Sequence, residues 1–211
     1  MSEVTFHGHS AVTVRSDGQQ LFVDPGGFSD LTGLADASAI LVTHAHPDHM
    51  SVAALAEVTA PVWAPQDAIA QLEQAGVPAD RLHAVAPGES FEAAGVDVSV
   101  MGGEHAQIYP GIPTPHNNAY LIGGRLLHPG DSLPPVPELG AVRFLLLPVA
   151  APWLKLSEAL DYATQYEGIR IAPIHDAILS PAGKGLVDTL LTRLLGEDVY
   201  GRIEEGRSLE L

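Results

Sequence analysis

Short runs of apolar and β-branched residues recur along the chain, and most of them end at Gly, Pro, His or Asp. This pattern is typical of strands that are bounded by turns. Strands are predicted over residues 4–6, 11–15, 20–23, 39–43, 60–63, 83–86, 96–101, 119–122, 125–128, 143–147 and 169–174. Ser16-Asp17-Gly18 supplies a hairpin turn between the second and third of them.

Helical patterns follow several of these strands. They cover 52–57 behind the N-cap Ser51, 66–75 up to Gly76, a segment opened by Ser157, and an amphipathic packing helix from Leu186 to Leu195. Strands interspersed with helices predict a mixed α/β layered domain. No repeat or linker divides the chain, so one domain over residues 1–211 is expected, with an ordered loop at 109–116.

Composition narrows the classes of partner and ligand. The 211 residues are 46% hydrophobic, which is enough for one buried core. Because 26 acidic residues face 10 Lys and Arg, the formal charge of −16 disfavours nucleic acid as a partner. The absence of cysteine leaves histidine and carboxylate as the metal ligands. Without a basic and apolar leader or a run of roughly 18 apolar residues, a cytoplasmic protein that does not bind membranes is expected.

The segment from Thr43 to His49 carries the strongest chemical signal. His44, His46, Asp48 and His49 place three imidazoles and one carboxylate within six residues, directly after an apolar strand. Adjacent imidazoles at a strand end offer nothing to a core, whereas zinc and similar cations take these ligands when thiolate is lacking. A metal site is therefore predicted here.

One segment cannot complete two coordination spheres, so further ligands are expected at other strand ends. His105 follows the strand through Met101, Asp131 follows the strand through His128, and His175 follows the strand through Ile174. Strand ends are where α/β architectures usually place chemistry. The sequence thus predicts one site assembled from distant segments.

The pattern H-x-H-x-D-H at residues 44–49, followed in order by His105, Asp131 and His175, resembles the metallo-β-lactamase superfamily. Gly8-His9-Ser10 and Asp24-Pro25 look like early motifs of the branch of uncharacterised metal-dependent hydrolases similar to ascorbate-6-phosphate lactonase. The resemblance covers nearly the whole chain. It implies an α/β fold, a four-layer αββα sandwich with the metals at one edge.

The resemblance also implies a dinuclear site. By position, the first metal would be held by His44, His46 and His105, the second by Asp48, His49 and His175, and Asp131 would bridge them. Zn²⁺ is the default, and Mn²⁺ or Fe²⁺ would suit the same ligands. The implied enzyme is a metal-dependent hydrolase whose metal-bridging hydroxide attacks a small ester, lactone, amide or phosphoester, with Asp48 and Asp131 as catalytic residues.

Neighbouring residues are assigned more loosely. Asp24 is expected to support a ligand histidine, and His9 is open between a wall of the site and a structural residue. His116 and His128 are expected to pack or to support ligands, and Lys155 is a candidate for binding an anionic group. In the lactonase branch a Gly-Gly-containing stretch commonly follows a Leu-Pro strand near this point. Here Leu147-Pro148 is not followed by Gly-Gly, which leaves the substrate open.

Several other functions remain open. Mononuclear iron dioxygenases of this fold share H-x-H-x-D-H, and oxygen consumption would identify one. His46 stands where flavin-linked di-iron members carry Glu, which disfavours them, and the charge disfavours a phosphodiesterase or nuclease acting on nucleic acid. A metal-binding protein without catalysis and a β-lactam hydrolase are weaker alternatives. A small-molecule substrate is expected, and a homo-oligomer is left open.

Overall fold

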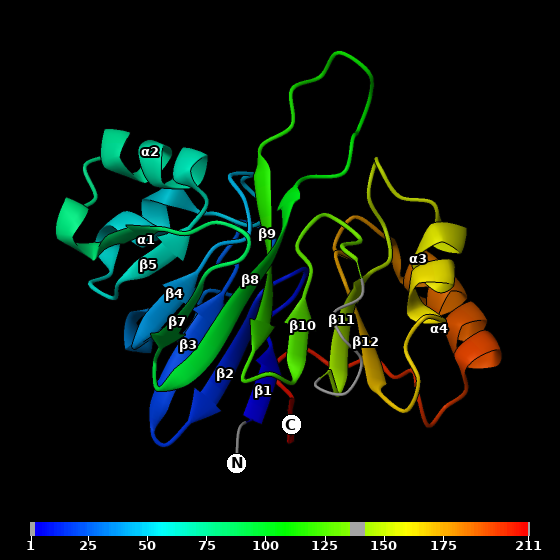
Figure 1. Ribbon diagram of the computed structural model, residues 1–211. Helices are drawn as coiled ribbons and strands as arrows, with labels where there is room; N and C mark the ends of the chain where they lie inside the picture. Colours follow the sequence, from blue (N-terminus) through cyan, green and yellow to red (C-terminus); the bar gives the residue numbers. More distant parts are fainter. Residues whose placement is uncertain (1–2, 136–141, 211) are drawn as a thin grey trace.

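The computed structural model describes residues 3–135 and 142–210, and it is built from two facing β-sheets with helices on both outer faces (Figure 1). This arrangement confirms the predicted αββα sandwich. The first sheet has the order β13-β1-β2-β3-β4-β5-β6. Its strands are β1 (Glu3–Phe6), β2 (Val12–Ser16), β3 (Gln19–Val23), β4 (Ala39–Leu41), β5 (Val62–Ala64), β6 (Leu82–Ala84) and β13 (Ser208–Glu210).

The second sheet has the order β12-β11-β10-β9-β8-β7. Its strands are β7 (Ser90–Ala93), β8 (Val96–Glu104), β9 (His116–Ile122), β10 (Leu126–His128), β11 (Phe144–Pro148) and β12 (Arg170–Ile174). The connection between β8 and β9 projects beyond the body of the sandwich (Figure 1).

Within residues 3–135 and 142–210, four α-helices cover the outer faces of the sheets. α1 (Val52–Glu57) and α2 (Gln66–Gln74) lie on the first sheet, and α3 (Leu156–Ala163) and α4 (Pro181–Leu195) lie on the second (Figure 1). Short 3-10 turns occur at Leu34–Asp36 and Ala79–Arg81. The Ser51 side chain caps α1 as expected, since it accepts a hydrogen bond from the backbone N–H of Ala54.

Strand periodicity explains the layering. In β3, Leu21 and Val23 belong to the core between the two sheets, whereas Phe22 points outward and packs with Leu55 of α1. A third cluster joins the second sheet to α3 and α4, where Leu145 packs with residues such as Leu191. Because side chains of a strand alternate between faces, each central strand contributes to two of these three clusters.

Parallel pairing brings the predicted ligand segments to one edge. β3, β4, β5 and β6 pair in parallel in the first sheet, and β10, β11 and β12 do so in the second. The carboxyl ends of these strands therefore share an edge. His44 lies beyond β4, Asp131 beyond β10 and His175 directly after β12.

Some expected boundaries were wrong. β7 and β13 had not been expected, and β9 begins at His116, which moves this residue from the predicted loop into a strand. α3 begins at Leu156 rather than behind Ser157. α4 buries Val187 and Leu191, but Leu186 and Leu194 are exposed, so only part of its apolar surface packs on the sheet.

No helix within the described parts of the chain is long and apolar enough to cross a membrane.

Candidate metal centre

The seven predicted ligands converge at the shared edge of the two sheets, together with His9. They form two groups, and within each group one ligand atom per residue lies within 4.8 Å of the others. The first group is His44, His46, His105 and Asp131, and the second is His9, Asp48, His49 and His175.

Asp131 lies between the two groups. Its Oδ2 atom is 3.2 Å from His105 Nε2 and 3.1 Å from His175 Nε2, and its Oδ1 atom is 3.1 Å from His49 Nε2. Ligand atoms held about 2.0–2.2 Å from one tetrahedral cation lie roughly 3.3–3.6 Å from each other. The observed distances of 3.1–3.2 Å are slightly shorter than this, and they place the Asp131 carboxylate in contact with histidines of both groups.

The arrangement around Asp131 also leaves polar atoms without partners. In the part of the chain that the structure describes, Asp131 Oδ1 and His175 Nε2 are buried and make no hydrogen bond. Such atoms are costly in a protein interior unless something else satisfies them. A divalent cation would satisfy both, so the residues present fit a metal centre.

The ring nitrogens that face away from the centre indicate which histidines can bind a metal. His105 Nδ1 lies 2.6 Å from the Ala106 carbonyl oxygen, and His175 Nδ1 lies 2.6 Å from the Ala150 carbonyl oxygen. His49 Nδ1 lies 2.7 Å from Asp24 Oδ2. Each Nδ1 therefore carries the proton in the neutral ring, which leaves a lone pair on Nε2 for a cation.

His9 and His128 show the opposite pattern. The backbone N–H of Ala177 donates to His9 Nδ1 at 3.4 Å, and that of Gly130 donates to His128 Nδ1 at 3.2 Å. An Nδ1 that accepts leaves the proton on Nε2. Accordingly His9 Nε2 lies 3.1 Å from Asp48 Oδ2, and His128 Nε2 lies 2.8 Å from the Ser10 carbonyl oxygen.

Asp24 supports the ligand histidines from behind, as expected from the sequence. It is fully buried, and its carboxylate accepts hydrogen bonds from the Thr43 backbone N–H at 2.7 Å and from Thr43 Oγ1 at 2.8 Å as well as from His49. Thr43 Oγ1 in turn lies 3.0 Å from His44 Nδ1. Asp24 thereby orients one histidine of each group.

Backbone strain is concentrated at the site. His9, Asp24 and His175 adopt the left-handed conformation, with φ of 49°, 51° and 59°. Such conformations cost about 1–2 kcal/mol each and persist where the surrounding structure imposes them. Gly26 is required for packing, because a Cβ atom there would lie 1.7 Å from the Asp48 carbonyl oxygen.

Two further residues contact Asp131 although the sequence did not indicate them. Asn117 Oδ1 accepts the backbone N–H of Asp131 at 2.9 Å, and its Nδ2 donates to the Pro129 carbonyl oxygen. Trp153 Nε1 donates to Asp131 Oδ2 at 3.0 Å. Neither Asn117 nor Trp153 is part of a His/Asp sequence motif, so only the tertiary structure identifies their contacts with Asp131.

Burial and the neighbouring charged groups shift the pKa values of the side chains in the centre. Burial raises the pKa of Asp131, but the neighbouring rings of His49, His105 and His175 outweigh burial and hold this pKa well below its usual range. Burial lowers the pKa of His175, while Asp131 and Asp48 raise it to a net value of about 9. Burial lowers the pKa of His44 to well below its usual range, with a further contribution from His49. The carboxylates are therefore ionised and available for a cation.

Other candidates lie outside the centre. His116 is largely exposed and its Nδ1 lies 3.4 Å from Asp67 Oδ2. The Lys155 side chain is 81% exposed, with its Nζ atom 4.0 Å from Glu158 Oε1. Asp176 is buried and pairs with Lys184 and Arg202, which agrees with a structural role.

Comparison with known proteins agrees with this fold. Residues 3–175 match the model of the beta-lactamase superfamily domain. Protein Rv0786c of Mycobacterium tuberculosis is 38% identical over 214 residues, which covers 96% of this chain and 97% of that protein. A UPF0173 metal-dependent hydrolase of Geobacillus sp. is 44% identical over 54 residues, covering 23% of this chain and 24% of the relative.

Solved structures share the fold at low sequence identity. Igni18, described as a novel metallo hydrolase from Ignicoccus hospitalis, superposes with a TM-score of 0.74 at 20% identity and covers 100% of this chain and 99% of its own. YhfI from Bacillus subtilis, a metallo-beta-lactamase fold protein, superposes with a TM-score of 0.75 at 16% identity and covers 100% and 99%. Because the family model matches residues 3–175, the chain belongs to the metallo-β-lactamase superfamily.

Proposed function

We propose that this protein is a hydrolase that binds two divalent cations between its sheets and cleaves a small ester, lactone, amide or phosphoester. The observation that carries the proposal is the pair of His/Asp groups that meet at Asp131. One group would suffice for a mononuclear oxygenase, so the presence of two favours the dinuclear hydrolase. The similarity to the Geobacillus relative, which is named a metal-dependent hydrolase, supports the same reaction class.

The ligands would divide between two cations. His44, His46 and His105 would hold the first, and Asp48, His49 and His175 would hold the second, with Asp131 common to both. Zinc is the metal proposed first because all donors are imidazole and carboxylate. Bound divalent cations supply Lewis acidity, which polarises the scissile group and makes water acidic enough to react near neutral pH.

The protein's own groups orient the reaction. Asp48 is half-buried, and its Oδ2 is held by His9 at 3.1 Å and lies 3.4 Å from His175 Nε2, so its carboxylate is fixed beside the second group. From there it would orient the attacking water and accept its proton. The Trp153 indole, partly exposed and bonded to Asp131, would close one side of the site to water.

A screen of hydrolysable substrates tests the proposed reaction class. The zinc-loaded protein would be assayed against neutral lactones, carboxylic esters, thioesters, phosphodiesters and β-lactams, with oxygen consumption followed in parallel after iron loading. Hydrolysis that is lost on chelation and regained on adding metal would support the proposal. Oxygen uptake by the iron-loaded protein without any hydrolysis would replace it with the oxygenase.

We infer that His9 is a positioning residue for Asp48 rather than a metal ligand, because its Nδ1 accepts and its Nε2 donates. His9→Gln keeps a donor within reach of Asp48, whereas His9→Asn tolerates the left-handed backbone but is too short. His9→Asn should weaken the second metal about 10- to 100-fold and leave the first unchanged, with partial rescue in His9→Gln.

Stepwise titration of the metal-free variants with Zn²⁺ against a chelator measures both sites. A ligand role for His9 would instead appear as equal loss of the second metal in both variants, since neither amide is a good zinc ligand.

Metal affinity should rise with pH. In the metal-free protein His175 has a pKa of about 9, because Asp131 and Asp48 outweigh the effect of burial. The protonated ring stabilises the metal-free fold fully below the ordinary value of 6.5, and this contribution is lost as the pH rises through about 9. A cation must displace that proton and also the one on His49, whose pKa Asp131 and Asp24 raise well above its usual range despite burial, so affinity should increase at least tenfold per pH unit between 6.5 and 8.5.

Competition titrations with Co²⁺ at three pH values in this range measure the slope. A flat profile after correction for the chelator's own protonation would contradict the assigned proton on His175.

A further inference from the structure

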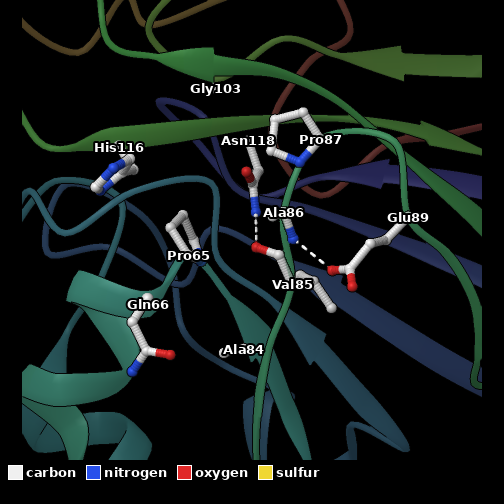
Figure 2. A pocket seen from close by; sticks show the side chains of 10 residues that line it. All are labelled: Pro65, Gln66, Ala84, Val85, Ala86, Pro87, Glu89, Gly103, His116 and Asn118. Atoms are coloured by element: carbon white, nitrogen blue, oxygen red, sulfur yellow. Dashed lines mark hydrogen bonds between the residues drawn. The ribbon is translucent and has the colours of Figure 1, made fainter.

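A cavity of about 300 Å³ lies between the start of α2, the segment that follows β6, and strands β8 and β9 (Figure 2). Its first wall consists of Pro65 and Gln66, at the start of α2, and of the segment from Ala84 to Pro87 with Glu89. Gly103, His116 and Asn118 of β8 and β9 form the second wall. None of these residues is needed to hold the proposed cations.

The topology places this cavity next to the ligands. β4, β5 and β6 are parallel neighbours, and the segments beyond them supply His44, Pro65 and Val85 in that order along the edge. Neighbouring strands lie about 4.8 Å apart, so the end of β6 is roughly 10 Å from the end of β4. On the opposite wall Gly103 precedes the ligand His105 by only two residues.

One hydrogen bond and a second cavity link this cavity to the metal centre. The backbone N–H of Asn118 donates to the Thr43 carbonyl oxygen at 2.8 Å, directly before His44. A second cavity shares Pro87, Gly103 and His116 with the first and also reaches Ser132, the residue after Asp131. A bound molecule could therefore extend from the cations into the 300 Å³ cavity.

The lining specifies the chemistry of an occupant. Pro65, Ala84, Val85, Ala86 and Pro87 present apolar surface. Two of the polar side chains that line the cavity are engaged with its backbone: Glu89 Oε2 accepts the Ala86 backbone N–H at 2.6 Å, and Asn118 Nδ2 donates to the Val85 carbonyl oxygen at 2.9 Å (Figure 2).

The charge of the lining residues and the volume of the cavity further restrict the kind of molecule that can bind there. No lysine or arginine is among the lining residues, whereas Glu89 is. An anionic group would be unfavourable there, and a neutral apolar group would gain from burial. The volume is about twice the roughly 150 Å³ that holds benzene.

We propose that this cavity binds a neutral, apolar arm of the substrate, of about six to eight carbon atoms, while the scissile bond lies at the metal centre. The inference rests on the proposed hydrolase function and names its substrate class. It predicts that the acyl or alkyl part of the preferred substrate carries no negative charge on this side.

Ala84 and Ala86 provide the test because both are exposed and line the cavity, so a larger side chain fills it without entering the core. Wild-type protein loaded with zinc would be assayed on p-nitrophenyl esters from acetate to octanoate. KM should fall roughly two- to fourfold per added methylene up to the hexanoate. Ala84→Phe should flatten this dependence, and Ala182→Phe on α4, an exposed site on the far sheet, should preserve it.

Binding of hexanamide followed by NMR on the ¹⁵N-labelled protein separates this proposal from the hydrolase itself. Shifts confined to amides such as those of Val85 and Gly103, and lost in Ala84→Phe, would support the site even if no ester is cleaved. Ester hydrolysis with no chain-length dependence, or hexanamide shifts that persist in Ala84→Phe, would overturn the cavity assignment and leave the hydrolase standing.

Discussion

Replacing Asp131 with alanine is expected to reduce bound zinc from near two to less than one per chain and to lower any hydrolysis by roughly a thousandfold or more. Asp131 is the carboxylate that faces both groups, with oxygens 3.1 Å from His49 and His175 and 3.2 Å from His105. On the proposed assignment, its loss removes a shared ligand and a negative charge that offsets two cations. Elemental analysis of desalted protein after zinc loading measures the change.

Two controls make this result specific. Asp97→Ala removes an exposed carboxylate from β8 and should leave metal content unchanged. His128→Ala deletes a buried ring that donates to the Ser10 carbonyl oxygen, so it should lower thermal stability without removing metal. Full zinc occupancy in Asp131→Ala would refute the bridging role, and a large loss of zinc in His128→Ala would mean that a ligand was misassigned.

Asp24→Asn is expected to cost several kcal/mol of stability, about 2–5, and to abolish binding of the second cation. Asp24 accepts three hydrogen bonds, from His49 Nδ1 and from the Thr43 backbone and hydroxyl groups. An asparagine amide must turn its NH₂ toward one of these donors. If it faces His49, that ring has to carry its proton on Nε2, and the lone pair for the metal is lost.

Thermal unfolding of the metal-free protein and zinc stoichiometry together measure this effect. Asp188→Asn is the matched control, because Asp188 also accepts from charged and hydroxyl partners, Arg202 and Tyr200, but lies away from the ligands. It should lose stability and keep both cations. Equal zinc content in Asp24→Asn and wild type would show that Asp24 does not fix the protonation of His49.

The fold and the convergence of the seven His and Asp side chains could be predicted from sequence because their signals are local. Strands such as β4 are apolar runs that end at a change in chemistry, and three histidines with one aspartate in 44–49 have no ordinary structural explanation. β13 was not predicted because Ser208–Glu210 is short and polar, and it becomes a strand only by pairing with β1. β8 extends through Gly102-Gly103, a pair that usually indicates a break, because β9 pairs with it throughout.

The supporting residues were harder to predict because their roles depend on tertiary contacts. Asn117 and Trp153 are isolated in sequence from every His/Asp motif, yet both bond to Asp131. The roles of His9 and His128 depend on which nitrogen meets a backbone N–H, and residue spacing carries no information on this. The types of side chain at the site could be predicted from the sequence, whereas the direction of their hydrogen bonds could be assigned only from the structure.

Zinc stoichiometry of the wild-type protein tests the central claim most directly. Protein stripped with chelator, incubated with excess Zn²⁺ and separated from free metal should retain two zinc ions per chain, one for each His/Asp group. Retention of one ion would contradict the dinuclear centre, and retention of none would contradict the metal site altogether.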